Sequence, residues 1–526
     1  MIVVMGVMAA SSLFVAAAFA AANGDLPLTR DSQDRKQAYA AAEAGINFYQ
    51  YHLNQDPDYW TRCTTVPAPN PSELNPVNQP WNGVAPDPRR WRSVAGLNTQ
   101  YTIELVPANG NTQCLTGAGS AGSMIQQATG GFKIRSTGRP RANSKLRRTL
   151  VAQFRRKSFL DFLYFTDYET VDPLAYDQDD QIRAGNECAD RYRAARTSWC
   201  DEIQFADNDS INGPFHTNDG ILTCGTPIFG RNSADPVEFM APPPGWRGLT
   251  SGEGCNAGGS PTFRGPVRTR VTKLTMPTTN AALEAAALPA YRFTGTTKIR
   301  FNAPPSNNMT VTTNYRHSTN GPGTGGTVTN MALPPNGVIY VRTGTGGCGT
   351  VIPPVKATYN EPQTCGNLYV SGTYTANMTL GAKNDIIVKP DTTTATSASL
   401  VKPAGSDHVL GLIANNFVRV YHRVSTDCDD NLAPELDDVT IDAAILTLAH
   451  SFVVDNWRCG EQLDDLTVIG AIAQKYRGAV GTTGGTGYIK DYNYDDRLRY
   501  RSPPYFLEPI AAGWGVVRYN EQVPAR

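Results

Sequence analysis

The sequence has no excess of either charge. Lysine and arginine together number 47, and aspartate and glutamate also number 47, so the formal net charge at pH 7 is zero. A neutral chain exerts no general attraction on nucleic acid or on an anionic membrane surface. We therefore expect no nucleic-acid partner.

Histidine is scarce, and common catalytic motifs are missing. The 526 residues include six histidines. There is no Gly-x-Ser-x-Gly elbow, no His-Glu-x-x-His pair and no P-loop. The absence of Cys-x-x-Cys argues against a zinc ribbon or a dithiol redox centre. We predict no catalytic residue, no cofactor and no metal site, and hence no enzyme.

The first 22 residues, Met1–Ala22, lack any charged side chain. An apolar segment of about 20 residues can cross a bilayer as a helix. Beyond it, small and aromatic residues recur at spacings of three and four and so share one helical stripe: Ala38, Ala41, Ala42, Gly45, Phe48, Tyr49 and His52. We predict one helix from Met1 to about Leu53, bent near Pro27, whose stripe packs in a filament.

A secretory signal peptide is the alternative interpretation of this segment. Ala18-Phe-Ala20 before Ala21 fits a small-residue cleavage site. However, no lysine or arginine precedes the apolar run, which also exceeds the usual length of about 7–15 residues. We favour a retained stem, and either interpretation places the rest of the chain outside the cytoplasm.

The segment Arg35-Lys-Gln-Ala-Tyr-Ala-Ala-Ala-Glu-Ala-Gly-Ile-Asn-Phe-Tyr49 resembles the start of bacterial type IV pilin-like proteins, especially PilX-type minor pilins. The resemblance implies a filament subunit that contacts other pilin subunits through its N-terminal helix and rests in the inner membrane before assembly. Such proteins usually carry a basic leader, a glycine and an early glutamate before the apolar stem. Here the chain begins at Met1 inside the stem, and Met1–Ala22 contains no glutamate. We therefore expect the reading frame to extend upstream of Met1.

Ten cysteines are spread through the body, and none lies in the stem. An even number in an exported chain indicates disulfides. Sequential pairing keeps each bridge within one local unit, although sequence alone leaves the connectivity open. We predict the bridges Cys63–Cys114, Cys188–Cys200, Cys224–Cys255, Cys348–Cys365 and Cys428–Cys459. Free buried thiols in a cytosolic protein are the alternative.

Short alternating segments indicate a body rich in β-structure. Residues 101–106, 132–136 and 150–154 predict a small antiparallel sheet. After about residue 336, runs of three to five apolar residues alternate with asparagine, aspartate or glycine, which favours a β-solenoid (β-helix); a β-sandwich is the alternative. A short helix is expected at Leu283–Leu288, between two prolines.

The predicted fold class is therefore α+β, with four parts. Residues 1–55 form a transmembrane and amphipathic helical stem, and residues 56–170 a pilin-like α+β domain. Residues 171–335 form a loop-rich β region. Residues 336–526 form a β-solenoid-like domain with a C-terminal cap.

Two motifs could carry chemistry. His216-Thr-Asn-Asp219 combines an imidazole, an amide and a carboxylate, but glycines and Pro214 bracket it as a turn, where asparagine and aspartate bind backbone groups. Asp491-Tyr-Asn-Tyr-Asp-Asp496 alternates oxygen ligands as a calcium loop does but lacks the central glycine. Asp427–Asn431 and Asp177–Asp180 are further acidic clusters. We favour structural or solvated roles for all of them.

These observations predict an exported structural subunit of a type IV pilus or related secretion filament. Its body would be anchored outside the cytoplasm and displayed at the cell surface for adhesion to a glycan or another surface target. The alternative is a secreted or anchored β-helix enzyme acting on polysaccharide, which requires several converging carboxylates.

Overall fold

The computed structural model describes residues 30–56, 59, 91–106, 131–207, 209–253, 255–256, 258–316, 321–348, 359, 361–390, 397–434, 436–510 and 512–525. The chain divides into a small unit, Met1–Arg156 with Gly513–Arg526, and a large unit, Lys157–Ala512. The predicted stem Met1–Ala22 and its bend at Pro27 lie outside the described residues. Within those residues, we find no helix with the length and apolar character needed to cross a membrane.

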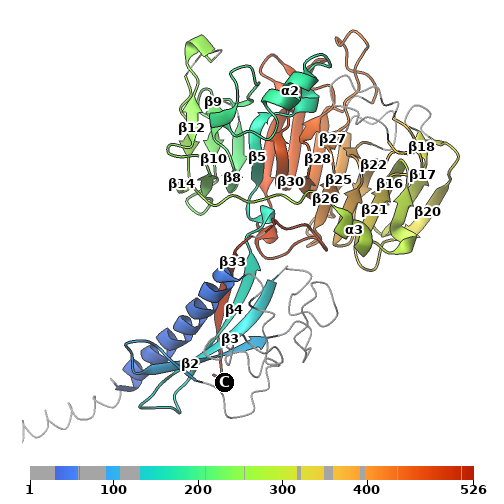
Figure 1. The fold of residues 1–526 in the computed structure, drawn as a ribbon. Helices are drawn as coiled ribbons and strands as arrows, with labels where there is room; N and C mark the ends of the chain where they lie inside the picture. Colours follow the sequence, from blue (N-terminus) through green and yellow to red (C-terminus); the bar gives the residue numbers. More distant parts are fainter. Residues whose placement is uncertain are drawn as a thin grey trace, which may run out of the picture. The chain divides into compact units, whose positions relative to one another are not determined.

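One amphipathic helix, residues 30–55, packs on the sheet of the small unit (Figure 1). Its buried face carries Ala38, Ala42, Ile46, Tyr49 and Leu53, each at most 4% exposed. This face continues the core formed by aromatic and aliphatic side chains of the sheet. The predicted helical stripe is therefore confirmed for these residues. The prediction that the stripe packs in a filament is wrong, because the stripe is covered by the chain's own sheet.

The small sheet has the strand order β1-β2-β3-β4-β33, and every pair is antiparallel. Its strands are β1 (Arg92–Ser93), β2 (Thr99–Val106), β3 (Gly131–Pro140), β4 (Arg148–Arg156) and β33 (Trp514–Gln522). The segments 101–106, 132–136 and 150–154, which alternate in sequence, lie within β2, β3 and β4. Alternation at period two therefore locates these strands correctly.

Small residues let the helix approach this sheet closely. A Cβ atom at Gly138 of β3 would lie 2.1 Å from the carbonyl oxygen of Ala38 and 2.5 Å from the amide nitrogen of Ala42. A Cβ atom at Gly45 would lie 2.2 Å from the hydroxyl of Ser136. At Gly138 the nearest atoms are helix backbone, so only glycine fits there, whereas at Gly45 a side chain of the sheet would have to shift.

The large unit is inserted between two adjacent strands of the small sheet. The chain leaves the small unit at the end of β4 and returns at the start of β33, where Arg156 lies opposite Trp514 in the antiparallel pair. The two ends of the insertion lie on adjacent, hydrogen-bonded strands. The strands β4 and β33 therefore pair as the two strands of a hairpin do, with the large unit in place of the hairpin loop.

The large unit is dominated by parallel pairing. One continuous series of parallel neighbours comprises β15 (Arg292–Thr294), β21 (Val338–Arg342), β23 (Met378–Ala382), β26 (Leu410–Ala414), β28 (Asp438–Thr447), β30 (Gln462–Arg477), β5 (Tyr164–Val171), β8 (Phe215–Thr217), β11 (Val237–Phe239) and β14 (Val267–Thr269). Figure 1 shows β30 and β5 side by side in the middle of this row.

The remaining strands join the same hydrogen-bonded sheet. One parallel series is β16 (Thr297–Asn302), β22 (Leu368–Thr373), β24 (Ile386–Val388), β27 (Val418–Val420) and β29 (Phe452–Val454). Another links β22, β25 (Ser397–Val401), β28, β30, β32 (Thr486–Tyr494), β7 (Ser210–Asn212), β10 (Ile228–Phe229) and β13 (Thr262–Phe263). Antiparallel pairs add β17 (Asn308–Thr313), β20 (Thr327–Ala332) and β31 (Gly481–Thr482).

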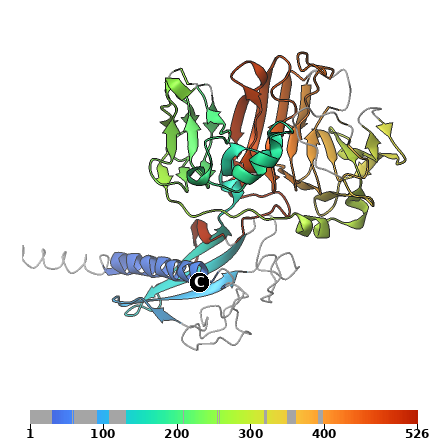
Figure 2. The same ribbon diagram turned by 45° about the horizontal axis from the view of Figure 1, so that its top comes forward.

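Small elements complete the large unit, as Figure 2 shows from another side. A three-stranded parallel sheet contains β12 (Trp246–Gly248), β9 (Ile221–Thr223) and β6 (Gln204–Phe205). A two-stranded sheet contains β18 (Tyr315–Arg316) and β19 (Gly321–Pro322). The helices are α2 (Gln181–Glu187) and α3 (Ala281–Ala286), the latter overlapping the helix expected at Leu283–Leu288.

The predicted fold class is wrong. The described residues are mainly β, with helix confined to residues 30–55, α2, α3 and short 3-10 turns. In place of a solenoid or a sandwich over 336–526, one sheet of 23 strands runs through the large unit. The error has a physical cause. Backbone pairing joins β5 to β30 and β7 to β32, strands remote in sequence, and the local rhythm of short strands carries no information about such partners.

Four disulfides confirm the sequential pairing: Cys188–Cys200, Cys224–Cys255, Cys348–Cys365 and Cys428–Cys459. The fifth predicted bridge, Cys63–Cys114, lies outside the described residues. Each observed bridge spans 12 to 31 residues, so each ties a local loop within the large unit.

Candidate binding pocket in the large unit

The sequence motif at His216 lies on a strand and at its end. His216 is the central residue of β8, with Phe165 of β5 on one side and Glu238 of β11 on the other. Asn218, Asp219 and Gly220 follow directly where the strand ends. The tight turn expected from the flanking glycines is thus replaced, at His216, by buried extended backbone.

His216 is fully buried and both ring nitrogens have partners. Nδ1 lies 3.0 Å from Oε2 of Glu238, and Nε2 lies 3.2 Å from Oδ1 of Asn218. Burial raises the pKa of Glu238, but its hydrogen bond to His216 and the charge of Lys157 outweigh that effect and lower the pKa to about 2. The imidazole is therefore a bridge between two fixed side chains.

Asp219 joins three segments through its carboxylate. It accepts hydrogen bonds from the backbone N–H groups of Glu169 at 3.1 Å, Arg193 at 2.9 Å and Gly220 at 2.8 Å. Its second oxygen also forms a buried ion pair with Arg196 at 2.5 Å. Through these bonds, the carboxylate of Asp219 holds the loop after α2 against the end of β8.

Asn218 makes a similar link to a different segment. Its amide nitrogen donates to Oδ1 of Asp167 at 2.9 Å and to the carbonyl of Leu274 at 2.8 Å, and its oxygen accepts from the N–H of Leu274 at 3.0 Å. The asparagine therefore does bind backbone, as its residue type suggests, but the backbone is remote in sequence.

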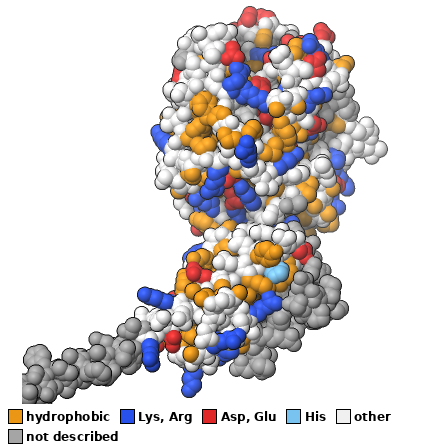
Figure 3. Space-filling model, turned by 60° about the vertical axis from the view of Figure 1, so that its left-hand side comes forward, with side chains coloured by type: hydrophobic (Ala, Val, Ile, Leu, Met, Phe, Trp, Pro, Cys, Tyr) orange, Lys and Arg blue, Asp and Glu red, His pale blue; other side chains and the backbone are white. Residues whose placement is uncertain are grey.

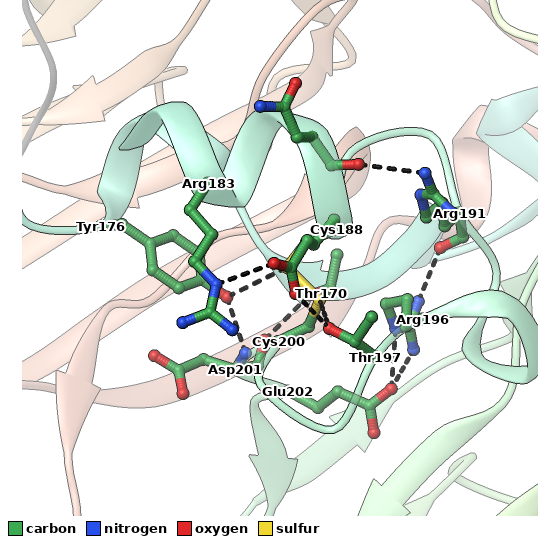
Figure 4. Close-up of a disulfide and its surroundings, with 12 residues drawn as sticks. Thr170, Tyr176, Arg183, Cys188, Arg191, Arg196, Thr197, Cys200, Asp201 and Glu202 are labelled. Atoms are coloured by element: carbon green, nitrogen blue, oxygen red, sulfur yellow. Dashed lines mark hydrogen bonds and ion pairs between the residues drawn. A yellow bond between two sulfur atoms is a disulfide. The ribbon is translucent and has the colours of Figure 1, made fainter. Parts of the chain in front are cut away.

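The loop held by Asp219 is closed by the Cys188–Cys200 disulfide (Figure 4). Within it, Arg196 donates to the carbonyl of Arg191 at 3.0 Å and forms an ion pair with Glu202. Below it, the hydroxyl of Tyr176 accepts a hydrogen bond from the N–H of Asp201 at 2.6 Å. A covalent bridge and these polar contacts fix the loop's conformation.

A pocket of about 520 Å³ lies between this loop and a proline-rich turn. Its floor is formed by Asn218, Asp219 and Gly220. Its walls are mostly apolar and are lined by Tyr192, Arg193, Ala194, Met240, Ala241, Pro242, Pro244, Gly245, Trp246 and Arg247. Figure 3 shows the side of the large unit that carries β12 and β14, where hydrophobic side chains gather next to basic ones.

The two aromatic side chains in the pocket wall, Tyr192 and Trp246, contact side chains outside the pocket. The hydroxyl of Tyr192 donates to Oδ1 of Asp167 at 3.2 Å, and its ring stacks on Tyr168 with centroids 4.9 Å apart. Burial raises the pKa of Asp167, although its hydrogen bonds with Asn218 and Tyr192 act in the opposite direction. Trp246 is only half-buried and packs against Phe263.

Each arginine at the pocket has an acidic partner. Arg247 forms an ion pair with the exposed Glu253, and Arg193 lies 3.6 Å from the carboxylate of Glu202. The pocket therefore combines flat apolar walls with paired donors and acceptors at its edge. Sequence reasoning selected the motif that contains Asn218 and Asp219 of the floor. It missed the walls, because only folding brings Tyr192, in the loop after α2, close to Trp246, at the start of β12.

The other acidic candidates pair with neighbouring side chains or are exposed. Asp491 is on β32 and accepts from Thr467 at 3.3 Å, whereas Asp495 pairs with Arg497. Asp496 pairs with Arg231 at 2.7 Å. The clusters at 177–180 and 427–430 are exposed apart from Cys428. In the described ranges, no three histidine, cysteine or carboxylate side chains converge as metal ligands would.

A buried ionic cluster around Arg419 escaped the sequence analysis. Arg419 on β27 is fully buried and pairs with Asp455 at 2.7 Å and with Asp385 at 3.0 Å, while Glu361 lies 3.5 Å away. Burial raises the pKa of Asp385 to about 6 despite the arginine. Three carboxyl groups around one guanidinium leave negative charge in excess. The only sequence signal was an arginine between Val418 and Val420.

No protein-family model matches the sequence, and a search of curated proteins finds no match either. Among solved structures, the competence-associated pilin ComZ from Thermus thermophilus is similar, with 12% sequence identity over 93% of this chain and 97% of that chain. The TM-score is 0.26, which is too low for the likeness to indicate a shared fold or function.

Proposed function

We propose that the chain is a minor pilin-like subunit, of PilX type, of a bacterial type IV pilus or a related secretion filament. One observation carries the proposal. A helix over residues 30–55 buries one face on an antiparallel sheet, and in the sequence it follows the uncharged segment Met1–Ala22. That arrangement suits a subunit that packs by its stem and displays its body.

The exposed face of the helix is the proposed contact with other pilin subunits. Ala40, Asn47 and Tyr51 are exposed and follow one another at intervals of seven and four residues, so they share a face. This face is opposite the stripe that packs on the sheet. These three side chains are small or uncharged, which supports side-by-side helix packing at their positions.

The location proposed for the body is outside the cytoplasm. Disulfides persist in oxidising compartments, and the four observed bridges support export. The proposal includes anchoring of the subunit in the inner membrane through Met1–Ala22 before assembly, followed by exposure of the large unit at the cell surface for adhesion.

We propose a structural role without catalysis. The two strongest catalytic candidates, His216 and Asp219, are committed to hydrogen bonds that hold strands and loops together. A general base needs a lone pair directed at a substrate. Their observed partners support the structural interpretation over the polysaccharide-enzyme alternative.

The proposal can be tested on the exposed helical face. In the native host, the double variant Ala40→Asp, Asn47→Asp should fold but fail to enter filaments, because carboxylates without partners would be desolvated at the helix contact. Lys145→Asp, on an exposed turn of the same unit, is the control. Immunoblots of sheared surface filaments measure incorporation. Equal incorporation of the double variant and the control would refute the proposal.

A further inference from the structure

We propose that the pocket between Tyr192 and Trp246 binds a neutral hexopyranose unit of a glycan. This inference deepens the adhesive role proposed above and depends on that role only for its biological purpose. The pocket has one rigid loop on each side and a volume of about 520 Å³, enough for a sugar ring with part of its neighbour.

The walls match the chemistry of a pyranose ring. Sugar rings present flat C–H faces that pack on aromatic side chains, and both Tyr192 and Trp246 line the pocket. Tyr192 is fixed by its hydrogen bond to Asp167, and the loop that carries it is closed by a disulfide. Preorganised walls reduce the entropy lost on binding.

The edge of the pocket offers the hydrogen bonds that hydroxyl groups need. The ion pair of Arg247 with Glu253 places donors and acceptors next to each other on an exposed edge. The indole N–H of Trp246 makes no hydrogen bond to a described residue and is a further donor. The polar atoms of the floor are already engaged by the fold, so specificity must come from the edge.

The charge distribution favours a neutral ligand. Arg247 and Arg193 each face a glutamate, and Asp219 is neutralised by Arg196. The pocket therefore has no uncompensated charge to attract a uronate or a phosphate. A single-stranded nucleic acid would also need a basic track along its backbone, whereas these arginines are individually paired.

Saturation-transfer difference NMR and calorimetry on the full-length chain test the proposal, with methyl hexopyranosides of gluco, galacto and manno configuration as probes. We expect at least one to bind, and Trp246→Ala to weaken that binding by about tenfold. Trp246→Phe, which keeps a ring, should retain most of it. Tyr500→Ala, an exposed aromatic outside the pocket, is the matched control and should bind as the unmodified chain does.

Three outcomes would overturn the inference: no binding of any neutral hexoside, binding that Trp246→Ala leaves unchanged in a folded protein, or tighter binding of a methyl uronate or an oligothymidylate. Folding of each variant is checked by circular dichroism. Because binding is measured on purified protein, a negative result leaves filament incorporation untouched, and failure of incorporation leaves sugar binding untouched.

Discussion

At the scale of single residues, the surroundings of a polar side chain decide its role. His216 and Asp219 combine residue types that catalysis uses, yet their partners are other fixed groups of the fold. A buried polar group must be paired or it costs free energy. In this chain, the side chains of His216 and Asp219 form hydrogen bonds within the fold, although the sequence motif alone suggests that they could take part in chemistry.

The hydrogen bonds and ion pairs of Glu238 predict a dependence of stability on pH. Its pKa is lowered to about 2, so its contribution to stability is present above the unfolded-state pKa near 4.5 and is lost as pH falls through 2. We expect Glu238→Gln to reduce the unfolding free energy of the large unit by about 2–3 kcal/mol at pH 7.

The difference between this variant and the unmodified chain should shrink steadily below pH 4, which chemical denaturation at a series of pH values can follow. Glu461→Gln, at an exposed carboxylate without an ion pair among the described residues, is the control. A difference that stays constant from pH 7 to pH 2 would contradict the assignment.

At the scale of elements, the N-terminal helix depends on glycine and alanine at its contact with the sheet. Gly138 of β3 is a steric necessity at this contact, because a Cβ atom there would overlap the helix backbone at Ala38 and Ala42.

We predict that Gly138→Ala destabilises the small unit by about 1–3 kcal/mol or more, since the new methyl group would overlap backbone atoms that cannot rotate away. Ala40→Ser, on the exposed face of the same helix, should change stability by less than about 0.5 kcal/mol. Thermal melts followed by circular dichroism compare the two. A Gly138→Ala protein as stable as the unmodified chain would mean that the helix does not pack as described.

At the scale of the whole molecule, the topology is an insertion. The small sheet is completed by β33, which comes from the C-terminal end of the chain and pairs with β4. The small unit therefore cannot close until the entire large unit has been made. The chain enters the large unit from β4 and returns from it to β33, and these two strands are neighbours in the small sheet.

This topology predicts that the large unit can be removed. Replacing Lys157–Gly513 by an Asn-Gly turn would join Arg156 to Trp514 across an existing antiparallel pair, at which a two-residue hairpin loop fits. We expect the shortened protein to unfold cooperatively and to protect the amides of β4 and β33 from hydrogen exchange. As a control, the same turn in a chain that also carries Gly138→Ala should unfold at lower temperature. A shortened chain without cooperative unfolding would contradict the description.

Local patterns in the sequence determined the elements whose contacts are close along the chain. The stripe at Ala38, Ala42 and Tyr49 follows from helical periodicity, and the alternation at 101–106 follows from strand geometry. The bridges within the large unit join cysteines 12 to 31 residues apart, so pairing in chain order sufficed to identify them.

Only the tertiary structure decided what depends on partners remote in sequence. The mainly β class depends on pairings such as that of β5 with β30, which are far apart in the sequence. The burial of Arg419 depends on Asp385 and Asp455, which are 34 and 36 residues away. The pocket walls at Tyr192 and Trp246 have the same origin. Propensity and periodicity act over a few residues, whereas strand partners and buried charges are selected by the free energy of the whole unit.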